Sequence, residues 1–361
     1  MATTSLMRMN INYTNSMTPP PFLTVNLVSG LTGSGKSSIA RASGRPSIGL
    51  TAADPESVSL AIAGHPTPRE VMLEVHPSAI PLEVAISVIA AGGDPALRPD
   101  TGAIRLGNFV SVLDASSFWR DIRSDSLAPE PPVPCVTHGE HDRTVADALV
   151  QQIEWASVVV INKTDLATAA DCADLRDFVR LLNPSSHVVF ARHGRSAVSP
   201  WLPPREDMLT WLQQSPGWIR QLNGEGLLAS SRTGLGCVVY RDPRPFHPGR
   251  LADFLSDSAT ESGEILRSRG LFRLASRPHV VGSWNSAGPT IEFEPTDMGS
   301  HDPESPWGQE IAFFGRDLDA SRLTANLDAC LLDDREFIGG PLEWRSLPDP
   351  FPAWDLNRDD D

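Results

Sequence analysis

The segment from Gly30 to Ser37 matches a phosphate-binding pattern in full. Its sequence, GLTGSGKS, fits G-x-x-x-x-G-K-[ST], in which glycines let several backbone N–H groups point at one phosphate. We expect Lys36 to contact the β- and γ-phosphates of a nucleoside triphosphate and the Ser37 hydroxyl to ligate Mg²⁺. The predicted phosphate site consists of Gly30, Gly33, Ser34, Gly35, Lys36, Ser37 and Ser38.

A second motif, Asn162-Lys-Thr-Asp165, has the residue types needed to recognise a purine base. The carboxylate of Asp165 can accept hydrogen bonds from both N1 and N2 of guanine, whereas adenine offers no such pair of donors. Asn162 and Lys163 would hold the loop and cover the base. Together the two motifs predict that GTP with Mg²⁺ is the bound nucleotide.

Two carboxylates at predicted strand ends are candidates for the acidic partner of Mg²⁺. Glu74 follows the apolar segment 71–73, and Asp114 follows the apolar segment 109–113. Either carboxylate could hold the ion through water, and Glu74 could also be only a strand-end side chain. The sequence leaves this choice open, and it makes Lys36 and Glu74 the candidates for a direct part in hydrolysis.

Apolar, β-branched segments alternate with helical patterns from Phe22 to about Arg192. Alternation of this kind predicts an α/β domain with a mostly parallel sheet and helices on both faces. Strands that are apolar throughout fit a sheet buried on both sides. Strands are predicted at 22–29, 70–75, 109–113, 157–161 and 187–190. One helix is predicted to begin near Ser37, and three others are predicted at 81–91, 143–155 and 171–182.

The second half of the chain has a different pattern, in which short strands dominate and helices flank them. Strands are predicted at 236–240, 271–274, 279–284, 291–294 and 310–314, with helices at 248–255 and 318–332. This order predicts a smaller α+β C-terminal domain after the P-loop NTPase domain. The final stretch is rich in Pro and Trp and is predicted to wrap the surface.

These patterns define the predicted domain organisation. It comprises a disordered leader at 1–21, a P-loop G domain at 22–200, a partly helical linker at 201–234, the C-terminal domain at 235–350 and an acidic tail at 351–361.

Composition limits the function classes. The 361 residues suit two domains, and the 45 Asp and Glu against 30 Lys and Arg give a net charge of −15, which argues against direct nucleic-acid binding. The chain has no window of about 18 consecutive apolar residues, so we expect no membrane association and a cytoplasmic location. The four cysteines are widely spaced, which does not suggest a disulfide scaffold.

Three further groups of residues could have a role. Cys135, His138 and His141 are candidate zinc ligands in a Pro-rich loop, for which a solvated loop is the favoured alternative. His247 either caps a helix start or lines the face toward the first domain. For Arg267 and Arg269 we expect surface ion pairs, with a small basic site as the alternative.

Several stretches around the two motifs resemble the CobW-type GTPases. Residues 143–156, which lead into VVVINKTDL, are similar to that family's helix and guanine loop. The resemblance implies a GTP-binding protein, a weak GTPase with Mg²⁺, linked to zinc and cobalt homeostasis as a metallochaperone-like protein. Its implied partners are a client metalloprotein or the ribosome. In the second half, the segments similar to the family's C-terminal domain are 244–251, 266–272, 315–319 and 327–332.

The chain departs from this family in two places. The family carries Cys-x-Cys-Cys between its P-loop and the next motif as metal ligands, and no Cys lies between Ser37 and Glu74 here. The family's Thr-Thr-Gly-type turn is replaced by Val-His-Pro, and Pro77 has no N–H to offer the γ-phosphate.

Two alternatives to a metal-handling GTPase therefore remain. One is a degenerate nucleotide-binding regulatory protein that acts through protein or ribosome contacts without metal delivery. The other is a P-loop small-molecule kinase, against which the Asn-Lys-Thr-Asp motif argues because a kinase would prefer ATP.

Overall fold

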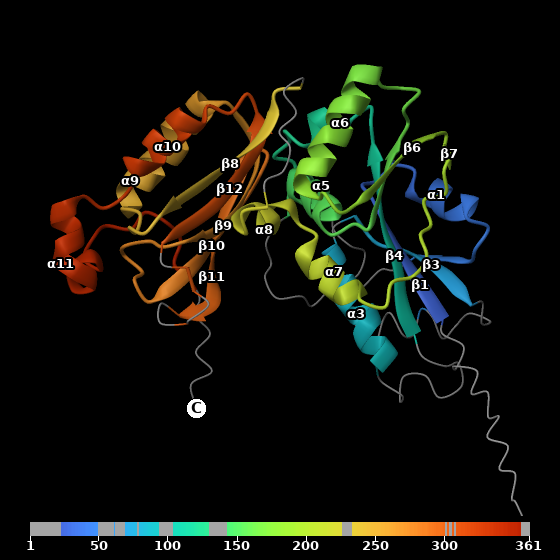
Figure 1. The fold of residues 1–361 in the computed structure, drawn as a ribbon, viewed down its shortest axis with the longest axis horizontal. Coiled ribbons are helices and arrows are strands. Elements are labelled where there is room, and N and C mark those ends of the chain that lie inside the picture. The colour runs from blue at the N-terminus through green and yellow to red at the C-terminus, as the bar shows by residue number, and fades with distance from the viewer. Residues whose placement is uncertain are drawn as a thin grey trace, which may run out of the picture.

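The computed structural model describes most of the chain. Within the described residues the chain forms two β-sheets, which lie side by side in Figure 1. The predicted leader at 1–21 and the candidate ligands Cys135, His138 and His141 lie outside the described residues. The described residues are 23–49, 61, 69–77, 79–93, 104–129, 143–225, 233–299, 302, 305–306 and 308–354.

The first sheet has seven strands in the order β2-β3-β1-β4-β5-β6-β7. The neighbours from β2 to β6 are parallel, and β7 is antiparallel to β6. Every residue of β1 and β5 is buried, which fits their mainly apolar sequences. The polar residues Thr24, Asn26, Ser29 and Asn162 are buried with them. The predicted mostly parallel sheet is thus confirmed. Its strands are β1 (Leu23–Ser29), β2 (Ser47–Gly49), β3 (Glu70–Glu74), β4 (Ile104–Asp114), β5 (Val158–Asn162), β6 (His187–Arg192) and β7 (Arg195–Ser196).

Helices cover both faces of this sheet (Figure 1). Thr144 and Thr168 cap α5 and α6, because each hydroxyl accepts the N–H of the residue three positions on. The helix after the P-loop is short, as its sequence predicts, and ends before Gly44, whose φ is 70°. The helices are α1 (Lys36–Ala42), α3 (Pro81–Gly93), α4 (Phe118–Asp121), α5 (Val145–Glu154) and α6 (Ala169–Leu182).

The connection to the second sheet is helical in part, with α7 (Met208–Gln214) and α8 (Gly217–Leu222). The second sheet is antiparallel, with five strands in the order β11-β10-β9-β12-β8. Its elements are β8 (Leu235–Asp242), α9 (Pro248–Asp253), a π-helical turn η2 (Phe254–Ser258), a 3₁₀ turn η3 (Ala259–Ser262), β9 (Glu264–Phe272), β10 (Val280–Ala287), β11 (Thr290–Gly299), β12 (Gln309–Arg316), α10 (Ala320–Asp328) and α11 (Asp334–Trp344).

One strand prediction for the second half was wrong, and the final stretch contains a helix that was not predicted. The strand expected at 271–274 is the end of β9, which begins at Glu264 and contains polar residues that broke the apolar pattern. The Pro- and Trp-rich stretch contains α11, which Gly340 kinks with a φ of 75° just before Pro341. Beyond this helix, Phe351 and Trp354 pack against the core of the C-terminal domain.

The second sheet is buried on both faces. The face toward the first sheet shares one apolar cluster with α5 and α6, to which Leu266 and Phe314 contribute beside Leu149 and Phe178. Figure 1 shows α5, α6 and α8 between the two sheets. The opposite face packs under α9 and α10, around the buried side chain of Trp284. The two domains are therefore joined by a continuous core.

A buried ion pair crosses this contact. The guanidinium of Arg267 on β9 donates to both carboxylate oxygens of Glu154 on α5, at 2.8 and 3.0 Å, and the two side chains are 2% and 3% exposed. Arg267 also donates to the Ser286 carbonyl and to Asn285 Oδ1. The expected surface pairing of Arg267 was thus wrong, because the ion pair lies between the two domains.

The structure also places the two other predicted candidates, Arg269 and His247. Arg269 lies over the ring of Trp218, and burial together with the charge of Arg267 lowers the pKa of Arg269. His247 caps α9, since its Nδ1 accepts the N–H of Arg250 at 3.3 Å. That helix packs on the face of the second sheet that points away from the first domain, so the capping interpretation of His247 is confirmed.

Of the helices within the described parts of the chain, none has the length and apolar character needed to cross a membrane.

Candidate functional site

The carboxyl ends of four neighbouring parallel strands bring the predicted site residues together. The P-loop follows β1, and Glu74 ends β3 beside it, paired in register with Val28. On the other side of β1, Asp114 ends β4 and pairs in register with Asn162 at the end of β5. Motifs far apart in the sequence therefore meet at one edge of the sheet, as is usual for ligand sites in parallel sheets.

Asn162 links the two motifs directly. Its side-chain amide donates to the Ser34 carbonyl within the P-loop at 2.9 Å, and its Oδ1 accepts the N–H of Gly194 at 3.2 Å. Asn162 is buried, so these two bonds satisfy an amide that water does not reach. The sequence suggested that Asn162 holds its own loop, whereas the structure shows that it also holds the phosphate loop.

The close approach of Asn162 requires glycine at position 35. Gly35 has a φ of 95°, a left-handed backbone conformation that side chains disfavour. A Cβ atom there would also lie within 3.0 Å of the Asn162 amide nitrogen. Gly33 has a similar φ of 84°, but a Cβ atom at Gly33 would meet nothing within 4 Å.

Lys36 lies inside the loop that it is expected to serve. Its ammonium donates to the Val75 carbonyl at 2.9 Å and to the Gly30 carbonyl at 3.3 Å. Burial lowers the pKa of Lys36, and the charge of Glu74 opposes that shift. An anion among these groups would stabilise the charged form of Lys36, so the loop has the electrostatic character of a phosphate site.

The structure separates the two acidic candidates. The Ser37 hydroxyl donates to one carboxylate oxygen of Glu74, and the Ser47 hydroxyl donates to the other at 2.5 Å. Glu74 thus lies beside the hydroxyl that is expected to ligate Mg²⁺. Ser47, on the three-residue strand β2, had no signal in the sequence that pointed to this role.

Asp114 is bound to other partners. Its carboxylate pairs with the ammonium of Lys163 at 2.6 Å and accepts the N–H and hydroxyl of Ser116. Burial alone would raise the pKa of Asp114, but the hydrogen bonds from Lys163 and Ser116 outweigh it and hold that pKa below its usual range. Asp114 therefore orients Lys163 of the base motif, which the sequence did not predict.

Asp165 has an unused acceptor. Its side chain is only 16% exposed, and Oδ2 lies 3.6 Å from Nδ1 of His193. Its Oδ1 is buried and has no hydrogen-bond partner among the described residues. Buried carboxylate oxygens without a partner are costly, so Oδ1 keeps an unused capacity to accept a hydrogen bond. Guanine, with its adjacent N1 and N2 donors, has the matching chemistry.

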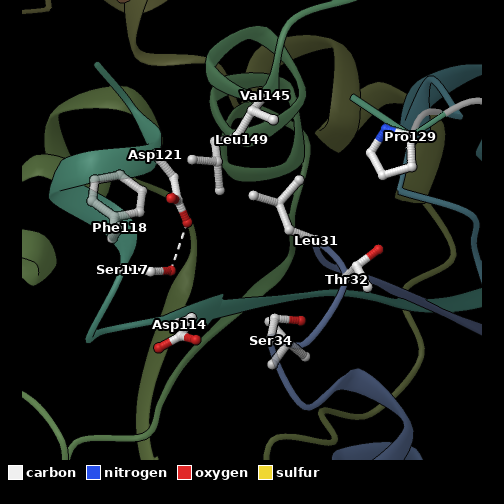
Figure 2. Close-up of a pocket in the computed structure, with 11 residues that line it drawn as sticks. Leu31, Thr32, Ser34, Asp114, Ser117, Phe118, Asp121, Pro129, Val145 and Leu149 are labelled. Carbon is white, nitrogen blue, oxygen red and sulfur yellow. Dashed lines mark hydrogen bonds between the residues drawn. The ribbon is translucent and has the colours of Figure 1, made fainter. Parts of the chain in front are cut away.

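A pocket of about 190 Å³ adjoins the P-loop on the side of α4 (Figure 2). Leu31 and Thr32 of the loop face Ser117 and Asp121 across it, and the Ser117 hydroxyl donates to Asp121 at 2.6 Å. The Ser34 hydroxyl, which also lines the pocket, is buried without a partner among the described residues. No sequence pattern pointed to Ser117 or Asp121, because the helix α4, which begins after Ser117 and ends at Asp121, is a single turn.

Comparisons with known proteins agree with these features. Residues 67–190 match the CobW/HypB/UreG nucleotide-binding domain, and residues 235–331 match the cobalamin synthesis protein cobW C-terminal domain. The first match begins after the P-loop, so the assignment of the P-loop rests on its own sequence and geometry. Both matches point to one family.

One curated relative is the zinc-regulated GTPase metalloprotein activator 1 of Dictyostelium discoideum. It is 26% identical over 275 residues, which cover 68% of this chain and 56% of the relative. The chain thus spans about half the length of the curated relative that it matches.

Among solved structures, the Zn(II)-bound YjiA GTPase from E. coli and a Zn(II)-bound triple mutant of YjiA are both 13% identical to this chain. Each match covers 88% of this chain and 100% of the other, with a TM-score of 0.36. Since the two matched domains come from one family and together span more than half of the chain, the chain belongs to the CobW-type family.

Proposed function

We propose that this protein binds GTP with Mg²⁺ at the edge formed by β3, β1, β4 and β5, and that it hydrolyses GTP slowly. The observation that carries the proposal is Oδ1 of Asp165, which is buried without a partner among the described residues, in a loop that Asn162 ties to the P-loop. An adenine base would leave this oxygen unpaired, because adenine has no adjacent pair of donors to replace N1 and N2 of guanine.

The phosphate half of the proposal rests on the P-loop. Lys36 would exchange its two carbonyl partners for phosphate oxygens, and Ser37 with Glu74 would hold Mg²⁺. The ion, when bound, supplies charge that neutralises the phosphates during transfer. Slow hydrolysis is proposed because Pro77 has no N–H with which to position the γ-phosphate.

The base half is tested by Asp165→Asn. Asparagine presents one donor group where guanine needs acceptors, so we expect GTP affinity to fall by about 10- to 150-fold, the loss typical of a hydrogen bond to a charged group. ATP binding, weak at the outset, should stay unchanged. Titration with fluorescent GTP and ATP in Mg²⁺ measures both affinities.

Asp207→Asn is the matched control for this substitution, because Asp207 is exposed and pairs with Arg205 at the surface. It should leave GTP affinity unchanged. Equal binding of GTP and ATP by the native protein, or no loss in Asp165→Asn, would contradict guanine recognition by this carboxylate. If neither nucleotide binds, the whole proposal fails.

The Mg²⁺ partner is tested by comparing Glu74→Gln with Asp114→Asn. Glu74 contacts Ser37, whereas Asp114 contacts Lys163. We expect Glu74→Gln to raise the Mg²⁺ concentration needed for half-maximal GTP binding by about tenfold, which corresponds to about 1.4 kcal/mol. Asp114→Asn should weaken GTP binding without changing its Mg²⁺ dependence. The opposite pattern in a Mg²⁺ titration would make Asp114 the ion's partner.

We also propose that the protein acts on a client metalloprotein in zinc or cobalt handling, which its family and the name of its relative support. The alternative is a regulatory protein that binds GTP without metal delivery, through protein or ribosome contacts. It is favoured by the lack of Cys between Ser37 and Glu74. Within the described part of the chain, no three His, Cys, Asp or Glu are placed to hold a metal ion. Equilibrium dialysis with zinc decides between the two roles.

A further inference from the structure

The C-terminal domain contains a second and larger cavity, which the nucleotide site does not use. Its volume is about 520 Å³, within the range of small-molecule sites, and its walls are mainly apolar. It lies on the face of the second sheet that α9 covers, at the end where β9 and the hairpin of β10 and β11 meet α4. The apolar side chains that line it include Phe254, Leu255, Leu266, Trp284, Ile291 and Phe313.

One wall of this cavity has an unusual backbone. After α9 the helix widens into the π-helical turn Phe254–Ser258, from which Phe254 and Leu255 line the cavity. The chain then leaves the helical layer at Gly263, where φ is 105° and a Cβ atom would lie 2.5 Å from the Asp317 carbonyl oxygen. π-helical turns are rare and occur often at functional sites. This local geometry ends the helical layer early and leaves the space above the strands.

The floor of the cavity carries a buried pair of hydroxyl groups. Ser268 and Ser286 lie on adjacent strands, are 2% and 7% exposed, and have their Oγ atoms 2.5 Å apart. The Trp284 indole N–H donates to Ser268 Oγ at 2.8 Å, and the Ser268 backbone N–H donates to Ser286 Oγ at 3.0 Å. Both hydroxyl oxygens therefore already accept hydrogen bonds.

This pair of hydroxyl groups has one more proton than its hydrogen bonds use. Two hydroxyl protons are present, and only one of them can lie between Ser268 and Ser286. The other has no acceptor among the described residues, whichever of the two hydroxyls donates across the pair. A buried donor of this kind in an apolar cavity favours a ligand that brings an acceptor oxygen.

The rim of the cavity is charged. Arg123, which follows α4, donates to both carboxylate oxygens of Glu264 at the start of β9, at 2.5 and 2.9 Å. These side chains are 43% and 37% exposed, so the ion pair faces solvent where the cavity opens. The cavity thus combines an apolar body, one buried donor and a polar entrance, which is the composition of a small-molecule site.

We propose that this cavity binds a small molecule with one or two apolar rings and a carbonyl or carboxylate oxygen. The rings pack between Trp284, Phe254 and Ile291, and the oxygen accepts the unpaired proton of the Ser268–Ser286 pair. This site is separate from the P-loop, since the residues that line it are not those proposed to bind the nucleotide.

The probe for this site is 2-naphthoate, which has two fused rings and a carboxylate. We expect one molecule to bind per chain, with a dissociation constant of about 1 mM or below, and the Trp284 indole N–H resonance to shift. A probe with the same rings and a trimethylammonium group, which accepts no hydrogen bond, should bind at least about tenfold more weakly.

Ile291→Trp fills the mouth of the cavity and should weaken 2-naphthoate binding at least about tenfold. Ile338→Trp is the matched control, because Ile338 on α11 is 84% exposed and lies outside the cavity. Ligand-observed NMR measures binding for both variants. The proposal is overturned if 2-naphthoate does not bind, if the two variants bind it equally, if the cationic probe binds as well, or if the Trp284 resonance does not move. That last measurement uses the native protein and holds even if Ile291→Trp does not fold.

Discussion

Arg267→Met is expected to lower the free energy of unfolding by about 3–5 kcal/mol, the largest effect of any single substitution considered. The change leaves the Glu154 carboxylate, 3% exposed, without its cation between the two sheets. It also removes the donor that Arg267 provides to the Ser286 carbonyl. Urea denaturation followed by circular dichroism measures the change in the free energy of unfolding.

Two further variants test whether the loss of stability comes from the buried position of this ion pair. Arg205→Met breaks an ion pair of the same type at the surface, where both side chains are about half exposed, and should cost less than about 1 kcal/mol. The double variant Arg267→Met, Glu154→Leu removes both buried charges and should recover most of the lost stability. If Arg267→Met and Arg205→Met cost the same, the buried ion pair does not hold the domains together as described.

Gly35→Ala is expected to reduce GTP affinity by more than about 100-fold while the protein stays folded. The alanine must adopt the backbone φ of 95° found at Gly35, which costs a residue with a side chain about 1–2 kcal/mol in the left-handed region. It also meets the Asn162 amide that holds the Ser34 carbonyl, so the P-loop must move away from the base motif. Fluorescent GTP titration measures the affinity, and a thermal melt checks the fold.

Gly33→Ala separates these two causes. Its φ of 84° carries a similar backbone cost, but no atom of the described residues lies within 4 Å of the added atom. We expect Gly33→Ala to lose at least about tenfold less GTP affinity than Gly35→Ala. Equal losses would mean that the contact with Asn162 does not matter and that only the backbone conformation does.

The first sheet and the position of the two motifs could be predicted from the sequence. A parallel strand covered on both faces is expected to be mainly apolar, and the segments ending at Ser29 and Asn162 have that character. Since the carboxyl ends of parallel strands share one edge, the P-loop and the Asn-Lys-Thr-Asp loop had to lie near each other. The hydrogen bond from Asn162 to the P-loop could not be predicted, because it depends on the register of the strands.

The ion pair between Arg267 and Glu154 could not be predicted, because its partners are 113 residues apart and neither has a local signal. The two arginines in the segment 266–269 suggest a strand at the surface. Arg267 is buried because β9 packs against α5. The same holds for the two acidic candidates at strand ends. Glu74 and Asp114 look alike in sequence, and only the positions of Ser37 and Lys163 distinguish them.

The continuous core has a consequence for how this protein can be divided. The apolar face made by Leu266, Ala312 and Phe314 is covered by α5 and α6 together with Trp218 and Leu222 of α8. A fragment cut within 201–234 would expose this face in one half and the matching face of α5 in the other, and would separate Arg267 from its anion. We therefore expect the two domains to fold as one unit, and neither to fold alone when it is moved into another chain.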